Sequence, residues 1–351
     1  MKMLLHPLTA AGFWLTNAQP MSALGTCKAT EITRFAPTQK TIDYLRDSYP
    51  HIPWPFHVIV TQGRRNPTES FRFYQIPKQW SQQQFARIAP GIYTPSPEQT
   101  LASLGKHLSI HELIYLSSIF CSGFRFDPNS PFGISPRTPL TSIAKIRESL
   151  NSPSQPYGFR PLKQALSYIT EGAESPPEVF MSMALSLPQK YGGSGIARSL
   201  ANWTYMPSQR AQAIAGREVV RPDITFVCNG KMVAVEYDSD SAHLSRAQAE
   251  RDEAKRLALE ADGMKVISVR PGHLKREDYM DLVAQEICFH LDIRQSKRPE
   301  CYSEQRDKLF QLDRSLSRFF LSVVTVENAE IGTLRTEAKA HHPYKSCNFA
   351  Q

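Results

Sequence analysis

The chain has 351 residues, of which 41% are hydrophobic and 21% charged; this is enough apolar material for two or three globular domains and excludes a disordered or fibrous protein. Its formal net charge of +8 favours a polyanionic partner such as a nucleic acid, because clustered Lys and Arg side chains neutralise phosphates. The sequence contains no apolar run long enough for a leader or a membrane span and no CxxC pair, so we expect a cytoplasmic protein without membrane contact, zinc ribbon or disulfide scaffold.

The first region, residues 1–95, predicts an α+β unit with a small antiparallel sheet. Residues 56–60 and 71–76 alternate in the manner of strands, and the polar stretch Gly63 to Pro67 between them is typical of a hairpin turn. Residues 91–94 predict a third strand.

Residues 96–173 predict a helical connecting region. Ser96-Pro97-Glu98 is a typical helix start, and the leucines that follow have helical spacing. Further helices are predicted through residues 113–120, 141–150 and 161–170, with a Pro- and Ser-rich loop at 151–156.

Residues 174–292 alternate between helical and strand patterns, which predicts an α/β domain. A helix begins at Ser175, and strands are predicted at 219–221, 223–228 and 232–237; Asn229-Gly230 between the last two is a strong hairpin signal. A helix of mixed charge, about 246–262, precedes a buried strand at 265–269. Residues 293–351 are interpreted as a basic extension with a helix near 304–319.

Carboxylates cluster at the open end of the predicted hairpin. Asp223 begins its first strand, Glu236 ends the second, and Asp238 shares a face with Glu236 because side chains alternate along a strand. Mg²⁺ prefers oxygen ligands, and a divalent ion can activate water for phosphodiester hydrolysis. The pattern therefore predicts a Mg²⁺ or Mn²⁺ site at Asp223, Glu236 and Asp238, although acids that merely end a strand remain the alternative.

The order of several short elements resembles the Vsr-like (very-short-patch-repair) branch of the PD-(D/E)XK endonuclease superfamily, which has a restriction-endonuclease-like α/β core sheet flanked by helices. The elements are Ser175-Pro176-Pro177-Glu178, Pro222-Asp223, Val235-Glu236-Tyr237-Asp238, His243, Arg251-Asp252 and Gly263 with Val266 to Val269. The resemblance implies that Asp223 and Glu236 bind metal, Glu178 is the acid of the first helix, and His243 and Asp252 act near the scissile phosphate. Asp238 stands where the motif has its lysine.

The N-terminal segments, with Gly91 to Glu98, also resemble antitoxin-like proteins of AbiE-type abortive-infection systems. The leading hypothesis is a metal-dependent endonuclease, with DNA favoured over RNA, acting in phage defence or DNA repair. The alternative is a degenerate nuclease fold that serves as a DNA-binding or antitoxin-like regulator. Candidate nucleic-acid contacts, each of which is also compatible with a solvated surface charge, are Arg64, Arg65, Lys255, Arg256, Arg270, Lys275 and Arg276.

Overall fold

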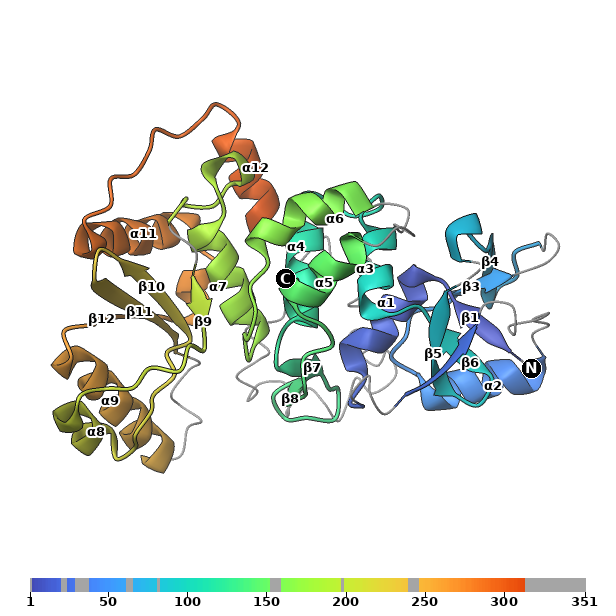
Figure 1. Cartoon of the computed structure of the whole chain (residues 1–351), viewed down its shortest axis with the longest axis horizontal. Helices are drawn as coiled ribbons and strands as arrows, with labels where there is room; N and C mark the ends of the chain where they lie inside the picture. The colour runs from blue at the N-terminus through green and yellow to red at the C-terminus, as the bar shows by residue number, and fades with distance from the viewer. Residues whose placement is uncertain are drawn as a thin grey trace, which may run out of the picture.

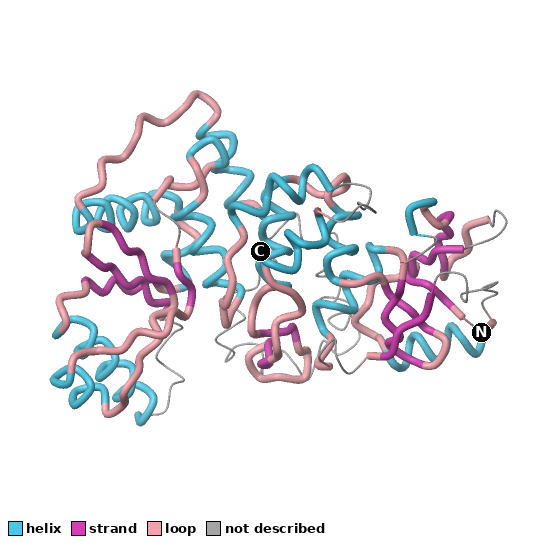
Figure 2. The backbone as a smooth tube through the Cα atoms, in the orientation of Figure 1, coloured by secondary structure: helices cyan, strands magenta, loops and turns pink. Residues whose placement is uncertain are grey.

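The computed structural model describes residues 2–19, 24–28, 38–60, 66–80, 83–151, 159–196, 199–238 and 246–312. The chain is mixed α/β: a sheet stands at each end of an elongated molecule, and helices fill the space between them (Figure 1, Figure 2). Within this described part, no helix has both the length and the apolar character needed to cross a membrane.

The N-terminal sheet has six strands in the order β2-β5-β6-β1-β3-β4. Helix α1 follows β1 directly and contacts β3, so it covers the sheet. The strands and helices are β1 (Met3–Leu5), α1 (Pro7–Thr16), β2 (Gly25–Lys28), α2 (Gln39–Ser48), β3 (Phe56–Val60), β4 (Phe71–Gln75), the 3₁₀ turn η3 (Lys78–Trp80), β5 (Gln84–Ala89) and β6 (Ile92–Thr94).

The predicted hairpin of the first region is wrong, because β3 and β4 pair in parallel, with Phe56 opposite Phe71. The ten residues between these strands are enough for the chain to return along the five-residue length of β3 before β4 begins. β1 pairs antiparallel with β3 and parallel with β6, so the sheet is mixed rather than antiparallel.

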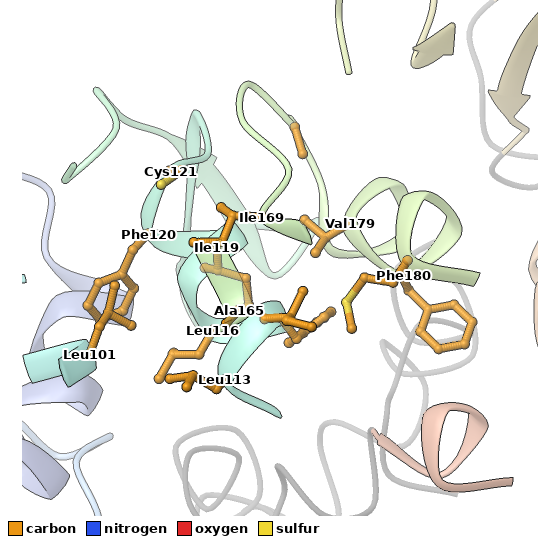
Figure 3. Packing of buried hydrophobic residues seen from close by; sticks show 14 of the residues in the cluster. Leu101, Leu113, Leu116, Ile119, Phe120, Cys121, Ala165, Ile169, Val179 and Phe180 are labelled. Carbon is orange, nitrogen blue, oxygen red and sulfur yellow. The ribbon is translucent and has the colours of Figure 1, made fainter. Parts of the chain in front are cut away.

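Helices dominate the middle of the chain. Ser96 and Ser109 cap α3 and α4 through capping boxes, in which the side chains of Gln99 and Glu112 accept a hydrogen bond from the N–H of the capping serine. The apolar faces of these helices meet α6 and α7 in a packed core that includes Leu113 (Figure 3). The elements are α3 (Pro97–Leu104), α4 (Ile110–Phe120), β7 (Phe124–Phe126), β8 (Ile134–Pro136), α5 (Ile143–Leu150), α6 (Phe159–Ala165) and the 3₁₀ turn η4 (Leu166–Tyr168).

The C-terminal sheet has four strands in the order β12-β11-β10-β9. The predicted strand at 219–221 is reduced to a single bridge between Val220 and Tyr205, and the fourth strand is β9 instead. The elements are α7 (Pro176–Ser186), η5 (Gln189–Tyr191), β9 (Leu200–Ala201), α8 (Gln209–Ala215), β10 (Ile224–Cys228), β11 (Lys231–Tyr237), α9 (Arg246–Ala261), β12 (Lys265–Val269), α10 (Pro271–Leu274), α11 (Glu277–Leu291) and α12 (Tyr302–Phe310).

Arg306 joins α12 to the rest of the C-terminal region. Its guanidinium is almost fully buried and donates to the carbonyls of Ala184 and Gly192, at 3.2 and 2.9 Å, and to the carboxylate of Asp281 at 2.9 Å. A charge this deep is tolerated because an opposite charge and carbonyl acceptors surround it. Arg306 therefore connects α12 to α7, to the turn after η5 and to α11.

Candidate active site

The hairpin of β10 and β11 is confirmed. Asn229 and Gly230 both have positive φ, 50° and 75°, which is the backbone conformation that a two-residue hairpin turn of this twist needs. Because the register pairs Ile224 with Val235, Asp223 and Glu236 are the next residues at the open end of the ladder. The turn thus sets which two carboxylates meet.

The two faces of this hairpin have different surroundings. Ile224 and Val235 point into the main core, which α7 and α11 also line. Ala234 points the other way and packs with Ala258 and Leu259 of α9. Since side chains alternate, Asp223 and Glu236 share the face that α9 covers.

Lys255 of α9 reaches between these two acids. Its Nζ lies 2.6 Å from Oε2 of Glu236 and 3.7 Å from Oδ1 of Asp223, and all three side chains are at most 22% exposed. The sum of the two distances, about 6.3 Å, is an upper limit for the separation of those carboxylate oxygens. The two acids are thus close enough to share one ligand. The interpretation of Lys255 as a solvated surface charge is wrong.

Glu178 occupies the first turn of α7, close to Asp223. Ser175 Oγ donates to its Oε1 at 2.7 Å, and Glu174 N and Asn202 Nδ2 donate to its Oε2 at 2.8 and 2.6 Å. Asn202 has φ of 46°, and its own N–H donates to the carbonyl of Asp223 at 3.0 Å. Through Asn202, the acid of α7 is therefore connected to the backbone that carries Asp223.

The charged groups of the site shift one another's pKa values electrostatically. Burial and the neighbouring Asp223 raise the pKa of Glu178 to about 8 and that of Glu236 to about 8, although Lys255 acts against the shift at Glu236. Burial lowers the pKa of Lys255, but Glu236, Asp223 and Asp252 outweigh it and the net pKa is raised. Three carboxylates around one ammonium would carry a net charge of −2, which favours a proton or a bound cation.

No protein-family model, characterised protein or solved structure matches this chain. The site must therefore be interpreted from its own geometry.

The other predicted site residues that the structure describes lie outside this group. Asp238 lies beyond the strand, where its Oδ2 is 3.5 Å from Nε of Arg270. Asp252 lies on α9, and its charge helps to raise the pKa of Lys255. His243 falls outside the described residues, as do Arg64 and Arg65. Among the residues that are described, no three His, Cys, Asp or Glu side chains are grouped closely enough to hold a metal ion by themselves.

The remaining candidate cations lie on the surface of the C-terminal region. Arg256 pairs with Glu253 and Glu260 along α9, and Arg276 pairs with Asp278. Lys275 is exposed in the loop between α10 and α11. Such exposed pairs contribute little stability and leave the side chains available to a ligand.

Sequence reasoning missed Lys255 as a partner of the acids, and also Asn202. The signal for Lys255 is its spacing, since it lies three and four residues before the buried Ala258 and Leu259 and so on the inward face of α9. Asn202 offers no comparable signal, because its role depends on a left-handed backbone conformation next to a two-residue strand.

Proposed function

We propose that the chain is a metal-dependent nucleic-acid phosphodiesterase with a Vsr-like, restriction-endonuclease-like C-terminal domain, and that DNA is its substrate. The position of Lys255 Nζ between Asp223 and Glu236 carries this proposal. The motif of this superfamily has a lysine two residues after the second acid, where this chain has Asp238. Lys255 would supply the same charge from the helix that crosses between β11 and β12.

A divalent ion fits the acceptors at this site. Oε1 of Glu236 is buried and has no hydrogen-bond partner within the described chain. Oδ2 of Asp223 accepts from Tyr237 N at 2.7 Å, and its Oδ1 lies 3.7 Å from Lys255 Nζ. Asp223 and Glu236 would hold Mg²⁺ or Mn²⁺ through these oxygens, with waters completing the shell. When bound, such an ion neutralises phosphate charge and lowers the pKa of a water molecule.

The chain's own residues would have separate tasks. The ammonium of Lys255 would donate to a non-bridging phosphate oxygen and stabilise the negative charge that grows as water attacks. Glu178 accepts its hydrogen bonds from its own loop and from Asn202, so it would fix the position of Asp223 rather than contact substrate. A role in phage defence or DNA repair, suggested by the family resemblance, belongs to the same proposal.

The test is cleavage of labelled DNA and RNA by the full chain with Mg²⁺ or Mn²⁺. Asp223→Asn and Glu236→Gln remove a charge without changing shape, and each should abolish cleavage. Asp278→Asn and Glu253→Gln are matched controls on exposed acids and should leave it intact. A wild-type protein that cleaves no substrate with either metal, or an active Asp223→Asn variant, contradicts the proposal.

A second candidate is a non-catalytic nucleic-acid-binding protein that keeps the fold. It is favoured by the observation that the described residues provide no group of three metal ligands. In that case the wild-type protein would bind nucleic acid equally well in EDTA and in Mg²⁺ and would never cleave it. Binding measured under both conditions, beside the cleavage assay, separates the two candidates.

A further inference from the structure

Lys255 reaches the acids from a helix that is packed against the C-terminal sheet. Ala258 and Leu259, one turn further along α9, are fully buried in one cluster with Ala234 of β11. Only 16% of the Lys255 side chain is exposed, and its Nζ lies 2.6 Å from Oε2 of Glu236. The packing of α9 therefore holds the ammonium beside the carboxylate oxygens rather than in solvent.

The ammonium and a divalent ion would use the same two carboxylates. Lys255 contacts Oε2 of Glu236 and lies 3.7 Å from Oδ1 of Asp223, whereas Oε1 of Glu236 has no hydrogen-bond partner in the described chain. An ion at Oε1 would lie one carboxylate group away from a positive charge, and like charges repel strongly at such distances in a partly buried site. Together, the two carboxylates and the ammonium carry a net charge of −1, whereas the two carboxylates alone would balance a divalent ion.

The side chain of Lys255 allows its ammonium to leave the acids while α9 stays in place. A flexible stem of four carbons carries the charge, and its three N–H donors can turn to another acceptor. A phosphodiester oxygen is such an acceptor, and it brings a negative charge between the two cations. Phosphate would therefore reduce the repulsion that opposes metal binding.

We propose that Lys255 is a tethered cation that competes with the divalent metal for Asp223 and Glu236, so that metal binds weakly to the free chain and tightly once a phosphodiester engages the ammonium. Such coupling is reciprocal, because the factor by which phosphate strengthens metal binding is also the factor by which metal strengthens phosphate binding. The free chain would thus carry little metal and complete its site on the substrate. This inference rests on the metal site of the proposed function and is independent of cleavage.

The first test measures metal binding in the absence of substrate. The full chain is titrated with Mn²⁺, and the electron paramagnetic resonance signal of the free ion gives Kd. Lys255→Met should bind Mn²⁺ more tightly than wild type by about tenfold or more, because a unit charge in contact with the ligands is removed. Adding Asp223→Asn should abolish this gain. Lys231→Met, which removes a half-exposed ammonium paired with Asp292, is the matched control and should bind like wild type.

Thermal unfolding and a phosphate probe give two independent measurements. Lys255→Met leaves Glu236 without its ion pair, so the free variant should be less stable than wild type, and Mn²⁺ should raise its Tm by more than it raises that of wild type. Dimethyl phosphate, a diester with one negative charge, should strengthen Mn²⁺ binding more in wild type than in Lys255→Met, because only wild type has an ammonium to draw away.

The inference is supported if Lys255→Met gains Mn²⁺ affinity through Asp223 and responds less than wild type to dimethyl phosphate. It is overturned if Lys255→Met binds Mn²⁺ no more tightly than wild type, if the gain survives Asp223→Asn, or if dimethyl phosphate has the same effect on both chains. A wild-type chain that cleaves no nucleic acid, while Lys255→Met shows the gain, refutes only the nuclease. A chain that cleaves, but shows no gain in Lys255→Met, refutes only the competition.

Discussion

Replacing Lys255 by Met tests whether helix α9 supplies the positive charge that the motif places at the position of Asp238. At an effective dielectric constant of about 20, charges 2.6 and 3.7 Å apart attract by roughly 6 and 4 kcal/mol before desolvation is subtracted. Met keeps the length of the stem and removes the charge. If Lys255 acts on the phosphate, we expect the cleavage rate to fall by about 10²–10³, the usual loss for one charge-stabilising group.

The assay is single-turnover cleavage of labelled DNA with Mg²⁺, with circular dichroism to confirm that each variant is folded. Lys231→Met is the matched control, because Lys231 is half exposed and pairs with Asp292 away from the acids. Adding Asp238→Lys to the Lys255→Met chain returns a lysine to the strand position and should recover at least part of the lost rate. Unchanged cleavage by folded Lys255→Met would refute the reasoning, whatever the double variant does.

Two further changes test burial and titration. Thr225→Val should stabilise the fold by about 1 kcal/mol, because Oγ1 of Thr225 is fully buried without a hydrogen-bond partner in the described structure and Val has the same shape; a lower urea midpoint would contradict this. His6 stays neutral in the fold because burial and its basic neighbours hold its pKa near 3, whereas the unfolded chain takes up that proton near pH 6.5. Stability from His6 is therefore lost as pH falls, by about 2 kcal/mol between pH 7 and pH 5. His6→Asn, which can still cap α1, should remove this slope in urea titrations, and an unchanged slope would argue against His6 as its source.

Local patterns predicted the elements that depend on neighbours in sequence. Asn229-Gly230 fixed the hairpin, and Ser96 marked a helix start, because each acts through its own backbone and side chain. Pairing direction was not local: β4 adds to the outer edge of β3 in parallel, whereas β1 pairs antiparallel with its inner edge. The connection between β3 and β4 is long enough for either pairing direction, so its polar residues could not show whether the two strands pair in parallel or antiparallel.

The candidate site shows the same division. The register of the hairpin was enough to bring Asp223 and Glu236 together, whereas Lys255 arrives from a helix whose placement depends on packing against Ala234. The average composition of the charged helix α9 predicted that all of its charged side chains are exposed to solvent. One stripe of α9 faces the sheet, however, and Lys255 lies on that stripe. An average over the whole helix could not single out Lys255.

The position of Arg306 also bears on how this region should be expressed in isolation. A fragment ending at residue 292, where the sequence predicts the nuclease domain to end, would lack the guanidinium. The carbonyl of Gly192 would lose the hydrogen bond from Arg306, and that of Ala184 would keep only the hydrogen bonds that Ser194 donates. Asp281 would lose a buried partner, which commonly costs about 3–5 kcal/mol. A fragment extended through residue 312 would keep α12 and the hydrogen bonds of Arg306 to α7, to the turn after η5 and to α11. Loss of activity on truncation near 292 would then report a missing structural brace rather than a missing catalytic group.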